Sequence, residues 1–309
     1  MNRKHFLKSL LATGAFASLG GMRAIATPGN RSMHSADTFT LNYAPHFGMF
    51  GNLGGSDFLD QLRFMHDAGF RSLEDNEMRN RPVEQQKRIA AEMSRLNMAM
   101  GVFVAHTIGW SEPNLTTDDS AAHDKFLEEI EQSVAIADRV NATWMTVVPG
   151  RLHPRLELAY QTANVIGILK KAAAILEPHG LVMVLEPLNP LRDHPGQFLT
   201  KTSQAYEICK AVDSPSCKIL YDVYHQQITE GNLIPNLDYA WEEIAYIQVG
   251  DNPGRNEPTT GEINYPNVFE FIHSKGYDGI IGMEHGNSMP GKEGEQAVID
   301  AYRECDPSL

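Results

Sequence analysis

Short apolar runs recur along the chain, and polar segments with a different periodicity separate them. Eight such runs lie at 39–44, 70–74, 99–106, 143–149, 181–187, 217–222, 244–250 and 279–284. Many residues in them are apolar at consecutive positions, a pattern typical of strands buried on both faces of a parallel sheet. The runs therefore predict eight buried strands.

The segments between the runs carry apolar residues three or four positions apart, as in 58–65, which predicts amphipathic helices. Residues at the helix ends agree with this interpretation. Ser56 is a predicted N-cap, Pro82 a predicted first-turn residue, and Gly69 and Gly180 fall just past predicted helix ends. Strands and helices are therefore expected to alternate through the chain.

This alternation, with no break in composition, predicts one α/β domain over residues 38–309. Eight repeats at this length favour a single (β/α)8 TIM barrel. A doubly wound open sheet is the alternative. Such a sheet normally carries a glycine-rich phosphate turn after its first strand, and "APHFGMFGNLGG" has glycines without that spacing.

Residues 1–26 predict an export signal peptide, because a basic start precedes a short apolar centre and an "AIA" ending. Within this segment, "RKHFLK" resembles the twin-arginine pattern, with Lys4 in place of the second Arg. We expect a linker at 27–37 and a periplasmic or otherwise exported barrel, with no stable membrane span after processing.

The net charge and the cysteine content disfavour some classes of binding partner and of fold. Removing the four basic residues of the signal takes the formal net charge from -13 to -17, which disfavours nucleic acid as a partner. Three cysteines are too few for a disulfide framework in a chain that can bury a large core. Cys209 and Cys217 flank a short turn, and they either pair or remain two buried thiols.

Polar side chains stand where the predicted strands end, which is where barrel enzymes gather reactive groups. Glu186, Asp222, Gln248 and Glu284 end four consecutive runs, the fifth to the eighth. Three converging carboxylates repel each other unless a cation neutralises them. This oxygen-rich set favours one divalent metal, Mn2+ or Mg2+, over Zn2+. The alternative is that each acid caps a neighbouring helix.

Four segments carry a family resemblance. In order and spacing, the chain resembles hydroxypyruvate isomerase and its relatives among the xylose isomerase-like TIM-barrel sugar isomerases and epimerases in "VLEPLN", "ILYDVYH", "YIQVGDNPGRNEPTTGEINY" and "IGMEH". The resemblance implies one divalent metal at Glu186, Asp222, Gln248 and Glu284. It also implies that Glu186 and Glu284 are the catalytic acid/base pair. Related ketose epimerases have His at the position of Gln248, so modest metal affinity is expected.

Five further residues are candidates for contact with substrate. His225 matches a family position that touches a substrate oxygen, with a structural histidine as the alternative. Arg255, in the charged loop after the seventh run, binds a substrate hydroxyl or carboxylate unless it is a solvated surface residue. Glu74 ends the second run and either touches substrate hydroxyls or is a buried, hydrogen-bonded acid. His106 and Trp110 follow the third run and predict an aromatic wall, with core packing the alternative for Trp110.

These features predict a metal-dependent isomerase or epimerase that acts on hydroxypyruvate or a free sugar through an enediolate. An exported address favours an unphosphorylated substrate. Two alternatives share the site: a lyase or dehydratase acting on a keto sugar, and a non-catalytic periplasmic sugar-binding protein. Metal-dependent AP endonucleases share the barrel, but missing histidine ligands and the acidic charge disfavour that activity. Assembly into a homo-oligomer stays open.

Overall fold

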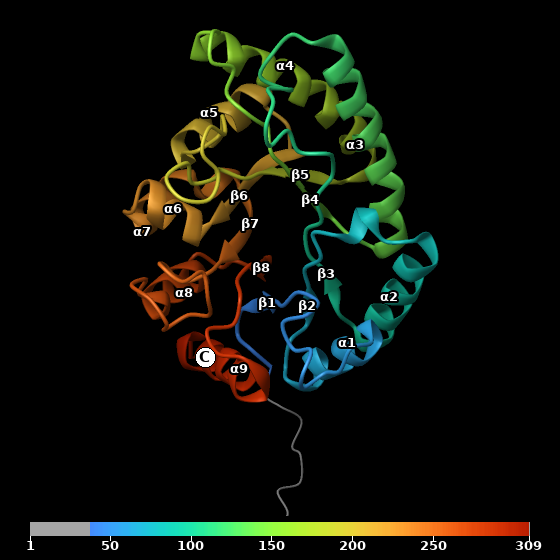
Figure 1. The fold of residues 1–309 in the computed structure, drawn as a ribbon, viewed down its shortest axis with the longest axis vertical. Coiled ribbons are helices and arrows are strands. Elements are labelled where there is room, and N and C mark those ends of the chain that lie inside the picture. The colour runs from blue at the N-terminus through green and yellow to red at the C-terminus, as the bar shows by residue number, and fades with distance from the viewer. Residues whose placement is uncertain (1–37, 309) are drawn as a thin grey trace, which may run out of the picture. The chain divides into compact units, whose positions relative to one another are not determined.

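Eight parallel strands alternate with helices in the computed structural model, which describes residues 38–308 (Figure 1). The strands are β1 (Asn42–Ala44), β2 (Ser72–Leu73), β3 (Ala99–Met100), β4 (Trp144–Val147), β5 (Val182–Leu185), β6 (Cys217–Asp222), β7 (Ile244–Val249) and β8 (Ile280–Met283). All eight predicted runs contain a strand. The second and third strands are much shorter than the runs 70–74 and 99–106 that predict them.

The strands form a closed ring. Six of them form one parallel sheet in the order β1-β8-β7-β6-β5-β4, and β2 pairs with β3. Isolated parallel bridges join the two sheets. His46 pairs with Glu74 on one side, and Met100 with Ala142 and Val104 with Thr146 on the other. The predicted (β/α)8 barrel is therefore confirmed, and the open-sheet alternative is wrong.

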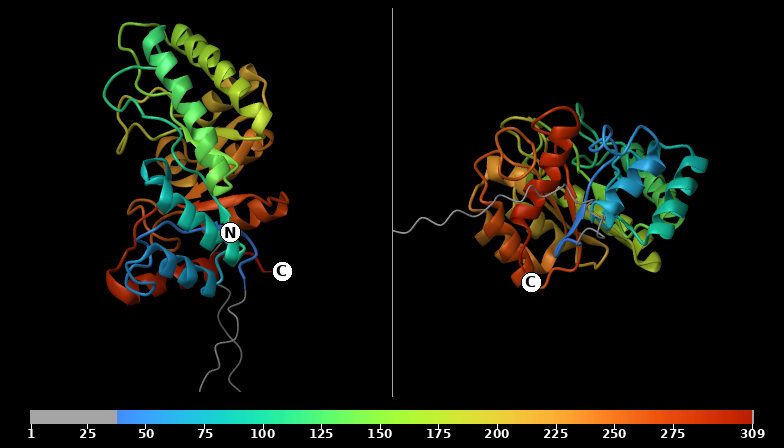
Figure 2. Two further views of the ribbon diagram at one scale, coloured as in Figure 1. Left: turned by 90° about the vertical axis from the view of Figure 1, so that its right-hand side faces the viewer. Right: turned by 90° about the horizontal axis from the view of Figure 1, so that it is seen from below.

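Helices surround the strands, and α3 and α4 lie side by side on the outside (Figure 2). The helices are α1 (Phe58–Asp67), α2 (Val83–Leu96), α3 (Ser120–Val140), α4 (Leu158–Leu176), α5 (Thr202–Val212), α6 (Val223–Thr229), α7 (Leu233–Ala240), α8 (Tyr265–Ser274) and α9 (Gly291–Cys305). Short 3-10 turns occupy Met78–Asn80, Glu177–His179 and Trp241–Glu243. None of the helices in the described residues is long and apolar enough to cross a bilayer.

Two of the four predicted helix-end residues are displaced by one position, and the two glycines lie where they were predicted. The cap of α1 is Asp57 rather than the predicted Ser56, because the Asp57 carboxylate accepts a hydrogen bond from the Leu59 backbone N–H at 2.8 Å. Pro82 stands just before α2 rather than in its first turn. Gly69 and Gly180 follow helix ends with φ of 105° and 64°, a left-handed conformation that favours glycine.

Apolar side chains fill the barrel beneath its mouth. Val184, Leu220 and Tyr246 belong to a small buried cluster contributed by several strands. Side chains two positions apart on a strand point to the same face. The residues two positions later are Glu186, Asp222 and Gln248, so alternation along β5, β6 and β7 directs these polar groups to the same interior, one layer nearer the mouth.

Cys209, Cys217 and Cys305 are all buried free thiols. Cys209 and Cys217 are neighbours, since a hydrogen bond between them and burial raise the pKa of the Cys209 thiol. Of the two alternatives for this pair, the structure has the buried thiols. The predicted signal peptide at 1–26 and linker at 27–37 lie outside the described residues.

Candidate functional site

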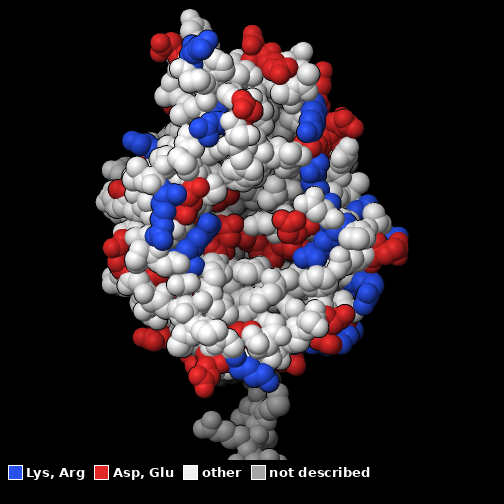
Figure 3. All heavy atoms as spheres, viewed as in Figure 1, with Lys and Arg blue, Asp and Glu red and all other residues white. Residues whose placement is uncertain are grey.

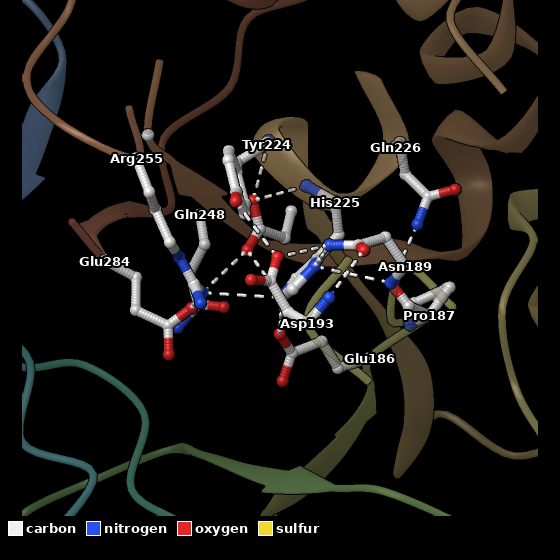
Figure 4. Close-up of polar contacts among 12 residues, drawn as sticks. Glu186, Pro187, Asn189, Asp193, Tyr224, His225, Gln226, Gln248, Arg255 and Glu284 are labelled. Carbon is white, nitrogen blue, oxygen red and sulfur yellow. Dashed lines mark hydrogen bonds and ion pairs between the residues drawn. The ribbon is translucent and has the colours of Figure 1, made fainter. Parts of the chain in front are cut away.

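Four side chains converge at the mouth of the barrel. Glu186 follows β5, Asp222 ends β6, His225 lies in the first turn of α6, and Glu284 follows β8. One donor atom from each of the four lies within 4.8 Å of the others, and the first three residues are buried. Figure 4 shows Glu186, His225 and Glu284 around one site, and acidic atoms line a hollow on this face of the molecule in Figure 3.

The two carboxylate oxygens of Asp222 lie in different surroundings. Oδ1 accepts from the backbone N–H groups of Tyr224 at 2.7 Å and His225 at 3.4 Å, and so caps α6. Oδ2 is buried and has no hydrogen-bond partner among the described residues. The helix-capping alternative is therefore right for one oxygen, and it leaves the other open to a ligand.

Gln248 lies beside Asp222 in the register of β6 and β7. Its Nε2 donates to Glu74 Oε1 at 2.7 Å, while its Oε1 is buried without a partner in the described part of the chain. The amide nitrogen can only donate and an ionised Glu74 can only accept, so with Glu74 in its charged form the nitrogen faces Glu74 and the oxygen faces away. Glu74 thus turns the carboxamide oxygen of Gln248 toward the open side of the site.

Glu74 is the buried, hydrogen-bonded acid of the two alternatives, since it is 2% exposed and also accepts from the Tyr246 hydroxyl at 2.9 Å. Two glycines make room for it. A Cβ at Gly282 would overlap Glu74 Oε2, and a Cβ at Gly101 would overlap the Tyr246 hydroxyl. The glycine in "IGMEH" is therefore required by the packing under the site.

The unpartnered oxygens of Asp222 and Gln248, with the carboxylates of Glu186 and Glu284, fit a hard divalent cation. Buried oxygens without a partner carry a desolvation cost that a cation would offset. The four residues predicted as metal ligands are thus gathered on adjacent strand ends, and their role as ligands remains a prediction.

The carboxylates strongly influence one another. Burial, followed by the charges of Glu284 and Asp222, raises the pKa of Glu186 well above its usual range. Burial also raises the pKa of Glu284 and Asp222, which Arg255 opposes. Burial and the Glu284 charge raise the pKa of Glu74 well above its usual range. The site therefore favours added positive charge.

Arg255 supplies part of that charge from the loop after β7. Its Nη2 donates to Glu284 Oε2 at 2.6 Å and lies 3.7 Å from Asp222 Oδ2, and its guanidinium sits over the Tyr224 ring. Burial alone would lower the pKa of Arg255, but these carboxylates raise it. The solvated-surface alternative is wrong, and contact with substrate remains a prediction.

His225 is fully buried, and burial together with the Arg255 charge lowers its pKa to about 3, so its ring is neutral. Its Nδ1 lies 3.3 Å from the backbone N of Asn189, and its Nε2 faces the acidic cluster at 3.7 Å from Glu186 Oε1. One nitrogen is thus held by the protein while the other faces the open site.

Trp110 and His106, the two residues of the predicted aromatic wall, lie in different surroundings. Trp110 is 48% exposed, which contradicts core packing, and its ring stacks on His194 with centroids 5.0 Å apart. His106 belongs to the packing instead. Its Nδ1 meets the Thr107 carbonyl oxygen, its Nε2 accepts from the Val148 backbone N–H, and its ring lies edge-on to Phe126. The ring beside Trp110 is thus His194 rather than His106, and contact of Trp110 with substrate remains a prediction.

Sequence reasoning missed three polar residues of the site. Asn189 contacts His225, Asp193 accepts from Asn189 Nδ2 at 2.7 Å, and Asn76 Nδ2 donates to Glu284 Oε1 at 3.1 Å. Asn189 stands in the quoted segment "VLEPLN", three residues after Glu186, so its position could have been noticed. Asn76 follows a short strand and offers no comparable signal.

Comparison with known proteins gives matches over most of the chain. The family model described as "Xylose isomerase-like TIM barrel" matches residues 62–305. The hydroxypyruvate isomerase of Escherichia coli (strain K12) is 29% identical over 276 residues, 86% of this chain and 99% of that protein. The 2-oxo-tetronate isomerase of Pectobacterium atrosepticum is 30% identical over 234 residues, 74% of this chain and 86% of that protein. A family 2 AP endonuclease structure from Brucella melitensis has a TM-score of 0.74 at 23% identity, covering 86% of this chain and 100% of that one, and shares the fold.

Proposed function

Because the chain belongs to the xylose isomerase-like TIM barrel family, as its motifs predict, we propose that it is an isomerase or epimerase of a small hydroxy-carbonyl compound. One observation carries the proposal. Carboxylate oxygens of Glu186 and Glu284 lie within 4.8 Å of one another at the mouth, with the unpartnered oxygens of Asp222 and Gln248 on the neighbouring strands. The names of the relatives, hydroxypyruvate isomerase and 2-oxo-tetronate isomerase, support the same class of reaction.

In this reaction one glutamate removes the proton from the carbon beside the carbonyl, and the other returns a proton to the neighbouring carbon. An enediolate links the two steps. A carboxyl group with a raised pKa is a stronger base when ionised and holds a proton nearer neutral pH, so burial suits both Glu186 and Glu284 to this task. Their roles exchange when the reaction runs in the other direction.

We propose that Glu186, Asp222, Gln248 and Glu284 hold one divalent metal, Mn2+ or Mg2+. When bound, such an ion polarises the carbonyl and offsets the negative charge that develops on the adjacent oxygens. All four side chains offer oxygen donors, which favours these ions over Zn2+. His225 of α6 and Arg255 of the loop after β7 would bind the remaining substrate oxygens.

The reaction is tested with the metal-loaded protein in D2O, by proton NMR on hydroxypyruvate, free ketoses and 3-keto sugars. Deuterium entering the carbon beside the carbonyl, with an isomerised or epimerised product, is the expected result. A product that has lost water or a sugar would instead assign a lyase. Absence of exchange on every substrate, from protein that binds Mn2+, would contradict the proposal and favour a binding protein.

We also propose that residues 1–26 direct export. The experiment expresses the full chain in a Gram-negative bacterium, separates periplasm from cytoplasm and sequences the amino terminus of the recovered protein. Cleavage after residue 26 with recovery from the periplasm is expected. An intact amino terminus in the cytoplasm would overturn this address.

A further inference from the structure

The orientation of the Asn189 side chain is fixed by backbone groups. Its Oδ1 accepts from the backbone N–H groups of Arg192 at 3.0 Å and Asp193 at 3.1 Å. Backbone nitrogens can only donate, so the atom facing them must be the oxygen. The amide nitrogen therefore points the other way, where it lies 2.7 Å from Asp193 Oδ2 and 2.7 Å from His225 Nδ1.

His225 Nδ1 is consequently surrounded by donors. Besides the Asn189 amide nitrogen, the backbone N–H of Asn189 points at it from 3.3 Å, and that group cannot be turned around. A ring nitrogen that receives N–H donors must present its lone pair. The ring proton of a neutral His225 is then on Nε2.

We propose that Asn189 is a positioning residue that holds His225 as the Nε2–H tautomer, so that His225 donates a hydrogen bond into the site and gives no lone pair to a metal. Asp193 stabilises the arrangement, because its Oδ2 accepts from both the Asn189 amide at 2.7 Å and the Tyr224 hydroxyl at 2.9 Å. This inference concerns the site of the proposed function. The tautomer of His225 does not depend on that function; only the meaning of the tautomer for catalysis rests on it.

The tautomer decides which of two ligand sets is available. By distance alone, His225 belongs with Glu186, Asp222 and Glu284. A histidine that binds a metal usually donates its other N–H to an acceptor, whereas the other nitrogen of His225 receives donors. The remaining oxygen donor is Gln248 Oε1, which Glu74 turns away from itself. The set is thus all oxygen, which favours Mn2+ or Mg2+ over softer ions.

The same tautomer creates a place for a substrate oxygen. His225 Nε2 lies 3.3 Å from Arg255 Nη2, which already donates to Glu284. With a proton on Nε2, two donors face each other across this contact. An acceptor oxygen to one side, within hydrogen-bond reach of both nitrogens, would satisfy both donors; a carbonyl or hydroxyl of a hydroxy-carbonyl compound is such an acceptor.

The direct test is long-range proton–nitrogen NMR of the metal-free full chain with 15N-labelled histidine. His225 is assigned by the signal missing from a His225→Gln variant. The expected spectrum has a protonated Nε2 and an unprotonated Nδ1. A protonated Nδ1 would overturn the proposal, and neither result depends on turnover, so failure of the proposed function is distinguishable.

A double substitution tests the consequence for metal choice. Asn189→Asp combined with Asp193→Asn keeps an oxygen for the two backbone donors and presents a carboxylate to Nδ1. A charged acceptor at this 2.7 Å contact should outweigh the longer 3.3 Å contact with the backbone N–H of residue 189 and move the ring proton to Nδ1. Freeing the Nε2 lone pair should then raise Zn2+ affinity relative to Mn2+ by about tenfold or more in calorimetric titrations. Asp193→Asn alone keeps the Asn189 amide and should leave tautomer and ratio unchanged. An unchanged ratio in the double variant, with the proton on Nδ1, would refute the assignment of metal choice to this tautomer.

Discussion

Gln248 Nε2 donates to Glu74 Oε1 at 2.7 Å, and this one contact decides which atom of the carboxamide faces the proposed metal site. Glutamine is a weak substitute for histidine as a ligand, because its amide can turn and present a nitrogen instead. Glu74, a buried acceptor three strands away round the barrel, removes that freedom. Glu74, for which the sequence left substrate contact and a buried acid open, is a buried acid that orients Gln248.

Glu74→Gln should weaken Mn2+ binding by about tenfold, since a glutamine at this position can donate as well as accept and no longer fixes the Gln248 amide. Titration calorimetry of the metal-free protein measures the effect. Tyr246→Phe is the matched control, because it removes the other hydrogen bond to Glu74 and leaves Gln248 held. Equal Mn2+ affinity in Glu74→Gln and wild type would contradict this account.

Glu186→Gln and Glu284→Gln should each lower kcat by about 10²- to 10⁴-fold, because each removes one proton-transfer group. Circular dichroism should show an intact fold, since both residues lie at the mouth, outside the packed interior. Glu262→Gln is the control, as this exposed glutamate only holds Asn252 and Gln227 in the outer loop. Deuterium exchange at the wild-type rate in either site variant would end the two-base assignment.

Arg255→Ala should raise KM and also move the pH dependence of kcat/KM. The Arg255 guanidinium opposes the effect of burial on the Glu284 carboxyl, so its removal should raise the pKa of Glu284 further. A higher pKa leaves less ionised carboxylate at a given pH, so the acidic limb of the profile should move to higher pH. Arg155→Ala, on the exposed surface, should change neither quantity. A profile that stays in place would separate Arg255 from Glu284 in function.

The stability of the metal-free protein should fall as pH rises. Burial raises the pKa of Glu74 and Glu186 well above the usual 4.5, so the folded state binds these protons more tightly than the unfolded state. Their stabilising effect is complete below pH 4.5 and is lost as pH rises through the folded pKa values. Thermal unfolding should therefore show a lower Tm at pH 8 than at pH 7, a range above the ordinary histidine pKa of 6.5 in which the buried neutral histidines add little opposing change. Excess Mn2+ should raise the Tm more at pH 8 than at the lower pH. A pH-independent Tm of the metal-free protein would contradict the linkage.

Gly282→Ala should destabilise the protein by about 1–3 kcal/mol, because the added methyl overlaps Glu74 Oε2 in a packed interior. Denaturant unfolding measures the change. Gly167→Ala is the control, since a Cβ at that position in α4 meets no atom within 4 Å and should stabilise the helix by roughly 0.5–1 kcal/mol. An unchanged free energy of unfolding in Gly282→Ala would show that the side chains packed under the site shift readily to make room for a methyl group.

The sequence was sufficient for the barrel and for the gathering of Glu186, Asp222, Gln248 and Glu284, because strand ends in a parallel barrel meet at one mouth whatever the details. It was insufficient for side-chain direction. His106 and Trp110 follow the same strand. Backbone groups hydrogen-bond to the ring of His106, whereas Trp110 lies at the surface and stacks on His194. Such choices depend on contacts with other loops, which no local pattern encodes. The same holds for Asn189, whose partners come from its own loop and from α6.

Asp222 joins the start of a helix to the site, because one oxygen caps α6 and the other is left open. A descendant of this chain that no longer catalysed anything would still be selected for a capping residue at position 222. The presence of aspartate there is consequently poor evidence of activity in a related sequence. Glu186 and Gln248 have no such second duty in the backbone, so their loss or retention is the more informative sign of whether a relative still works as an enzyme.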